Sequence, residues 1–184
     1  VATPAIFYSG LSFSAATAGN LLLVGQASVS AQTWGAAPSG FTLLSQVTDG
    51  SGNMSAVWYY KIAAGGETSV TFNWSFSISS QRFLMMEIEG PFAVSPLDVL
   101  AEDESNISSA VTSQASGTTA TTAQADAVAV AFFAADSASA VDGGRSYNNS
   151  FSEVVFGDTS FVARPMAAFA LRLLSATGAY SCTY

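Results

Sequence analysis

The acidic side chains offer most of the chemistry that this sequence could perform. Glu87 and Glu89 are two residues apart, so on a β-strand both side chains point to the same face. Two carboxyl groups on one face are what a glycoside hydrolase needs for its acid and its base or nucleophile. They flank Ile88, however, whose side chain would point to the core. This pattern favours two solvated carboxylates near the end of a strand, and we predict that neither is catalytic.

A second acidic group lies in the middle of the chain. Glu102, Asp103 and Glu104 follow one another, with Asp98 and Asn106 nearby, and together they offer the oxygen ligands that Ca²⁺ prefers. The spacing lacks the alternating acids and the glycine of an EF-hand loop. We therefore interpret the run as a solvated acidic loop, with a bound Ca²⁺ as the alternative.

The residues that most enzymes use are missing from this chain. Its 184 residues include no histidine and one cysteine, Cys182. Without histidine neither a Ser-His-Asp nor a Cys-His arrangement can form, and the commonest metal ligand is lost. A single cysteine allows no intramolecular disulfide and no cysteine-based zinc site. The sequence predicts a non-enzymatic protein with no catalytic residue, cofactor or essential metal, in which Cys182 is a small core residue.

Charge and hydropathy narrow the class of partner. The chain has five basic and thirteen acidic residues, a net charge of −8, whereas nucleic-acid binding requires a basic surface. Apolar runs such as 127–135 are far shorter than the ~20 residues of a membrane-spanning helix. No basic segment followed by an apolar one opens the chain, so no signal peptide is visible, and removal of a leader or initiator Met before Val1 is the open alternative. We expect neither nucleic acid nor a membrane as partner.

Charged residues are scarce for a protein that would be surrounded by water on all sides. They make up 10% of the chain, against about 25% in an average protein. Because protein interfaces are depleted in charged residues, much of this surface is expected to be covered by other subunits. We predict a homo-oligomer, with a trimer as the favoured form, or part of a larger lattice. The alternative is a chain whose surface is made of Ala, Ser and Thr.

Two stretches of the chain repeat the same order of strands and turns. Residues 19–76 contain NLLLVGQAS, FTLLSQVTD and MSAVWYYKIAAGGETSVTFNW, and residues 126–184 contain DAVAVAFFA, FSEVVFGDT and RPMAAFALRLLSATGAYSCTY. Lys61 and Arg172 occupy matching places in the third strand of each. Repeats of this kind indicate a repeated supersecondary unit. With turn signals about every 8–12 residues, the chain predicts one domain over 1–184: an antiparallel, jelly-roll-like β-sandwich with two pseudo-repeated halves.

Individual segments sharpen this prediction. Residues 54–62 alternate aromatic side chains on both faces and predict a central strand covered on both sides. Residues 97–122 are rich in Ser, Thr and Ala, and we expect two or three short exposed strands there. Residues 166–174 have high helix propensity, but their place in the repeat favours a strand. The predicted core residues are Val24, Trp58, Tyr60, Ile62, Phe72, Leu84, Met86, Val130, Phe132, Phe169 and Leu171.

Two loop aromatics are candidate contact residues. Trp34 is the only bulky residue of AQTWGAAPSG, and Tyr147 lies in the Gly/Asn-rich segment DGGRSYNNS. Trp34 either pins its loop to the core or projects as a contact residue, and an exposed indole can stack on a sugar ring. An extracellular carbohydrate-binding module or lectin-like surface protein is therefore one interpretation of the chain.

Most of the chain also resembles a pattern found in phage structural proteins and in phage-related bacterial surface proteins. The resemblance lies in TAGNLLLV, PSGFTLLS, AVWYYKIAAGGETSVTFNWS and FLMMEIEGP, and it continues from ADAVAVAFF to ATGAYSCTY. It implies a virion surface component of the capsid decoration, head-fibre or tail-fibre type, which would be extracellular. The implied partners are further copies of the chain, other virion proteins and, as a further candidate, glycans of the host surface.

Overall fold

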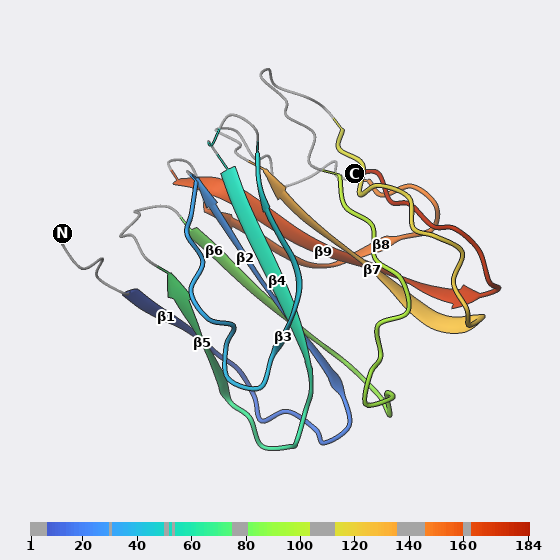
Figure 1. The fold of residues 1–184 in the computed structure, drawn as a ribbon, viewed down its shortest axis with the longest axis horizontal. Coiled ribbons are helices and arrows are strands. Elements are labelled where there is room, and N and C mark those ends of the chain that lie inside the picture. Colours follow the sequence, from blue (N-terminus) through green and yellow to red (C-terminus); the bar gives the residue numbers. More distant parts are fainter. Residues whose placement is uncertain are drawn as a thin grey trace.

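The structure is a computed structural model that describes residues 7–29, 31–49, 52, 54–74, 81–103, 113–135, 146–159 and 163–184. All regular secondary structure within these ranges is β, and the strands are antiparallel (Figure 1). The strands are β1 (Phe7–Ser12), β2 (Leu21–Val29), β3 (Thr42–Thr48), β4 (Met54–Ile62), β5 (Ser69–Trp74), β6 (Gln81–Ile88), β7 (Asp126–Ala135), β8 (Ser152–Thr159) and β9 (Ala163–Ser175).

The strands form three sheets, of which the largest is the middle layer. It has the order β3-β4-β2-β6, and its β2, β4 and β6 contact a three-stranded sheet of order β7-β9-β8. On the opposite face, Val70 and Phe72 of the small β1-β5 sheet pack against Val24, Val57 and Tyr59. The predicted antiparallel β-sandwich is thereby confirmed, including a strand over 166–174, whereas the jelly-roll order stays a prediction.

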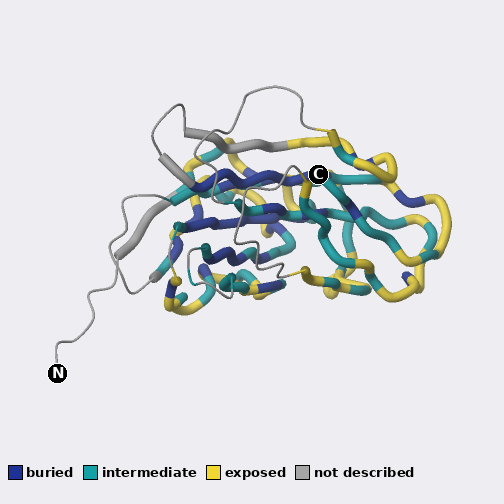
Figure 2. The backbone as a smooth tube through the Cα atoms, turned by 90° about the horizontal axis from the view of Figure 1, so that it is seen from above, coloured by how far each residue is buried: buried dark blue, intermediate teal, exposed yellow. Residues whose placement is uncertain are grey.

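Strand β2 is the centre of the fold because both of its faces are covered. Leu21, Leu23 and Ala27 belong to the cluster between the two larger sheets, while Leu22 and Val24 point the other way and are fully buried. Figure 2 shows the buried residues concentrated in the inner strands and the exposed ones in the outer strands and loops. A strand covered on both faces can be apolar at nearly every position, as LLLV is.

A glycine in β2 sets how closely the two larger sheets approach. A Cβ atom at Gly25 would lie 2.7 Å from Cε2 of Phe132 and 3.1 Å from Cζ of Phe169. The centroids of these two rings are 4.9 Å apart, and Phe132 also stacks on Trp58 at 5.9 Å. Because Gly25 has no side chain, Phe132 of β7 and Phe169 of β9 have room to pack against the Trp58 indole of β4.

Strand β4 behaves as its alternation predicts. It pairs with β3 on one side and β2 on the other, so it is an inner strand. Val57 and Tyr59 face the β1-β5 sheet, whereas Trp58 and Tyr60 face the three-stranded sheet. The prediction of a central strand covered on both sides is confirmed.

Cys182 closes a third cluster on the far face of β7. It is fully buried beside Phe133 and Ala170, and this burial raises the pKa of its thiol to about 11. The prediction that Cys182 is a small core residue is confirmed.

The strands expected in 97–122 are not found in its described residues, where Ala115 makes a single isolated bridge to Thr183. Residues 114–122 do run antiparallel to residues 178–184 at the end of the chain. Side-chain hydroxyl groups, however, replace some of the backbone acceptors that a regular pair of strands would use. The hydroxyl oxygens of Ser116, Thr119 and Thr122 accept hydrogen bonds from backbone N–H groups of the C-terminal segment at 3.0 to 3.2 Å. Ser and Thr compete with the backbone in this way, which explains why the described residues 113–122 form no regular strand. Residues 104–112 of the segment lie outside the described residues, so strands there stay a prediction.

A pairing pattern occurs twice in the fold. In the four-stranded sheet β4 lies between β2 and β3, the two strands that precede it in the chain. In the three-stranded sheet β9 lies between β7 and β8 in the same way. The register shifts between Leu43 and Ser45 in one sheet and between Glu153 and Val155 in the other. These positions match in the two sequence stretches; the superposition of 19–76 on 126–184 as a whole stays a prediction.

Candidate functional site

A large cavity, partly open to solvent, lies beside β4 and β7 of the two larger sheets. Its volume is about 1360 Å³, and it is lined by residues of β3 and β4, by residues from both faces of β7, by two connecting segments, 91–103 and 114–124, and by the C-terminal segment. We call residues 91–103 the strap. In Figure 1 the strap follows the end of β6 and runs back past β7.

The cavity explains why part of the predicted core is not fully buried. Five of the predicted residues, Val24, Phe72, Leu84, Met86 and Phe169, are at most 5% exposed. The remaining six pack against the cluster between the sheets but are only half-buried, because they come from strands that border the cavity or from the ends of the sheets. These six residues are Trp58, Tyr60, Ile62, Val130, Phe132 and Leu171.

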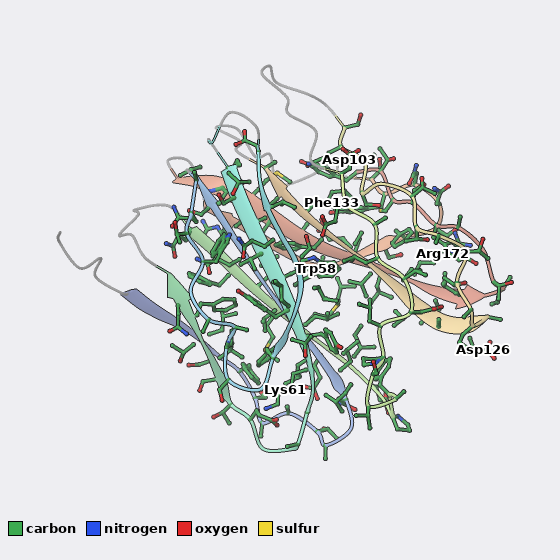
Figure 3. All side chains as sticks on the ribbon, in the orientation of Figure 1. Trp58, Lys61, Asp103, Asp126, Phe133 and Arg172 are labelled. Atoms are coloured by element: carbon green, nitrogen blue, oxygen red, sulfur yellow. The ribbon has the colours of Figure 1, made fainter. Side chains whose placement is uncertain are left out.

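The inner wall of the cavity is apolar, and the charged side chains that line it, among the described residues, are all acidic. Trp58, Val130 and Phe132 contribute to the apolar part. Five carboxylates also line the cavity, whereas no lysine or arginine does so within the described part of the chain. Figure 3 shows Trp58 near the centre of the molecule, with Asp103 at the top and Asp126 at the right. The five are Asp49, Asp98, Glu102, Asp103 and Asp126.

The strap is fixed at several points. The backbone N–H of Phe92 donates to the carbonyl of Gly19 at 3.3 Å. Further along, Oδ2 of Asp98 accepts a hydrogen bond of 2.7 Å from the backbone N–H of Ala123. Near its end, a Cβ at Gly117 would lie 2.7 Å from the carbonyl oxygen of Glu102, so only glycine allows this close approach.

The Asp98 bond also bears on the calcium alternative. One of the carboxylates predicted as a ligand joins the strap to the neighbouring segment through a backbone N–H group. Glu102 and Asp103 are exposed, and the described residues contain no group of three or more His, Cys, Asp or Glu placed to hold a metal ion. Glu104 and Asn106 lie outside the described residues.

The strap carries exposed apolar side chains, of which Leu97 and Leu100 also border the cavity. Val94 is 97% exposed, Leu97 45% and Leu100 38%. Single exposed apolar residues are common on proteins, but three within seven residues of one fixed segment form a local apolar surface. We call these three residues the strap face.

The carboxylate pair of β6 is accounted for by local structure. Oε1 of Glu87 accepts hydrogen bonds from the backbone N–H of Thr17 at 2.9 Å and from Nδ2 of Asn20 at 2.7 Å. Glu87 therefore holds the turn that precedes β2. Glu89 is exposed just beyond the end of β6. Both border a small pocket of about 530 Å³ on the surface. The absence of catalysis stays a prediction.

The two aromatic contact candidates are both half-buried. Trp34 packs against the cluster that contains Val24 and Phe72, and its Nε1 atom is buried, so the indole does pin its loop to the core. The hydroxyl of Tyr147 donates to Oε2 of Glu153 at 2.7 Å, and its ring centroid lies 6.0 Å from that of Phe133. A contact role for either residue stays a prediction. A partner would contact the exposed part of the ring.

The strap face was not singled out from the sequence, although a signal for it exists. In PFAVSPLDVLA the apolar residues Val94, Leu97 and Leu100 recur every third position, which is not the alternation of a strand, and Pro96 between them argues against a regular helix. Apolar residues in such an irregular segment are a signal for apolar surface that the fold covers only in part.

No protein-family model matches the chain, and no curated protein or solved structure is found to be similar to it. The residues described by the structure include no helix of the length and apolarity needed to cross a membrane.

Proposed function

We propose that this chain is a non-enzymatic structural module of a virion surface, of the capsid decoration or fibre type, and that it assembles with copies of itself through the strap face. The observation that carries the proposal is the exposure of Val94, Leu97 and Leu100 on a segment that hydrogen bonds hold in place. A fixed apolar surface needs no ordering before it binds, so little conformational entropy opposes association.

The composition supports the same proposal. Covering apolar surface stabilises a complex by roughly 25 cal/mol per Å², and stable interfaces bury about 1,200–2,000 Å² in total. The strap face is only part of such an area. The remainder must come from surface that is poor in charge, and this chain has 10% charged residues. The virion assignment rests on the sequence motifs from TAGNLLLV to FLMMEIEGP, which resemble those of phage structural proteins.

Sedimentation velocity of the purified chain tests the assembly. We expect an oligomer whose mass is a small multiple of the monomer mass of 18.9 kDa. The double variant Val94→Asp/Leu97→Asp should shift the chain to monomer, because buried unpaired carboxylates are costly at an interface. The matched control is Leu173→Asp, at a leucine that is 76% exposed on β9, and it should leave the mass unchanged. A wild-type chain that stays monomeric at high concentration would contradict the proposal.

Electron microscopy of phage particles from the source organism tests the virion assignment separately. Gold-labelled antibodies raised against the chain should decorate the outside of intact particles. Label found only on cells or cell debris would leave the self-assembly intact but would overturn the assignment to a virion.

A further inference from the structure

We propose that the cavity between the sheets binds one amphiphile that has a long apolar chain and a cationic head group. This proposal goes beyond the proposed function, because it requires a small molecule bound in the cavity of each chain, whereas assembly requires contacts with a second copy. Leu97 and Leu100 belong to the strap face and also border the cavity, so the variants that test this site are made at other positions.

The size of the cavity points to a ligand of lipid dimensions. Protein interiors are normally packed as densely as organic crystals, and the few voids they contain are small. A space of about 1360 Å³ exceeds the roughly 300–1,000 Å³ of most small-molecule sites. A compact metabolite would leave much of it empty, while a long flexible hydrocarbon chain can follow it between the sheets.

The inner wall suits a hydrocarbon. Trp58 and Phe132 stack on each other at 5.9 Å, and Tyr60 and Val130 stand beside them on the same two strands. These side chains are only half-buried although they face the inside of a sandwich. An apolar chain in contact with them would remove their remaining surface from water, which is the main favourable term in apolar binding.

The charges select the head group. Asp49, Glu102, Asp103 and Asp126 line the cavity together with Asp98, and none of the described lining residues is basic. Their combined field repels a carboxylate or a phosphate and attracts an ammonium group. In Figure 3 Asp103 lies at the top of the molecule and Asp126 at its right, so the acidic residues are spread around the cavity and are not gathered at one point.

Isothermal titration calorimetry with three ligands of equal chain length tests the proposal. Dodecylammonium, dodecanol and dodecanoate are titrated into the full chain near neutral pH, at low salt and below the concentrations at which they form micelles. We expect saturable binding of one dodecylammonium per chain, about tenfold or more tighter than dodecanoate, with dodecanol between them. The preference should shrink when salt is raised to about 1 M, since the Debye length then falls to about 3 Å.

Two sets of variants locate the binding. Val130→Trp places an indole in the cavity and should weaken dodecylammonium binding at least tenfold, whereas Leu173→Trp, at an exposed position of β9, should not. Glu102→Gln/Asp126→Asn changes two exposed carboxylates and should reduce the preference for the cation over dodecanoate. If Val130→Trp does not fold by circular dichroism, the carboxylate variant decides the question.

Any of four outcomes would overturn the proposal. Two concern the wild type: no saturable binding of any of the three ligands, and equal affinity for the ammonium and the carboxylate. Two concern the variants: unchanged affinity in a folded Val130→Trp chain, and unchanged preference in the carboxylate variant. None of them bears on sedimentation of the strap-face variants, so failure of this site and failure of the proposed assembly can be told apart.

Discussion

The two sides of the layer between the larger sheets are built differently. On one side, which we call the packed side, β6 contacts both β8 and β9, and Leu84, Met86 and Phe169 are at most 5% exposed. On the other, the strap side, β4 and β7 carry half-buried aromatic rings around a cavity of about 1360 Å³, and the strap passes beside it. The same kinds of residue thus form a closed core on one side and a lined space on the other.

The difference indicates which side maintains the fold and which side is available for binding. Closely packed apolar side chains on the packed side supply stability, since every methyl group there has neighbours on all sides. The strap side leaves apolar surface within the molecule and, on Val94, Leu97 and Leu100, on its outside. Both proposed interactions, with a second copy and with an amphiphile, use this side.

The largest contrast is expected from one substitution made on each side. Leu84→Ala, in the packed side, should lower the free energy of unfolding by about 2–5 kcal/mol, because it opens a new void. Leu44→Ala, whose side chain already borders the cavity, should cost less than about 1.5 kcal/mol. Urea unfolding of both variants measures the difference. Equal losses would mean that the two sides are equally packed.

A smaller effect is expected at the boundary between the two sides. Gly25→Ala introduces a Cβ at 2.7 Å from the Phe132 ring, so it should destabilise the chain by about 1–3 kcal/mol. Phe132→Leu removes the ring atoms that clash, and the double variant should lose less stability than the sum of the two single ones. Additive losses in a double-mutant cycle would show that this close contact does not set the approach of the sheets.

The smallest effect is expected at a turn that belongs to neither side. The Lys61 ammonium, 2.8 Å from Glu67, and the backbone N–H groups of Ala64 and Gly65 lower the pKa of the Glu67 carboxyl from 4.5 to about 2. Since the folded pKa lies below the unfolded one, this stabilisation is complete above about pH 4.5 and is lost as the pH falls towards 2.

Both side chains of the ion pair are partly exposed, 21% for Lys61 and 18% for Glu67, so solvent screens it and we expect about 0.2–1 kcal/mol from this turn. Denaturant unfolding between pH 2 and 6 should show a weaker pH dependence in Glu67→Gln than in the wild type. An NMR titration that finds the usual carboxyl pKa at Glu67 would refute the ion pair as a source of stability.

The architecture could be predicted because strand alternation and turn residues are local signals. Val57 and Tyr59 on one face of β4, and Trp58 and Tyr60 on the other, were assigned correctly from spacing alone. The extent of burial could not be predicted, because it depends on the distance between two sheets. Nothing in the sequence around Trp58 indicates that its side chain borders a cavity. Ser116 and Thr122 were misjudged because their hydroxyl groups take over hydrogen bonds that a strand would make through its backbone.

Most of the candidate site could not be predicted from the sequence. Trp34 and Tyr147 were chosen as bulky residues in polar loops, and the structure places both partly within clusters. Part of the strap, residues 97–103, falls in the segment for which short exposed strands were expected, and its apolar residues Leu97 and Leu100 were not singled out. Position relative to other elements, which no local pattern encodes, decides whether such residues are covered.

Hydrogen exchange of the strap, measured in dilute and in concentrated solutions of the chain, tests the central claim most directly. The claim is that the strap side is the binding side of a self-assembling module. We expect amides of residues 92–103 to gain protection as the chain associates, while those of β6 and β9 stay as they are. Association that protects β6 or β9 and leaves the strap unchanged, or no association at all, would contradict it.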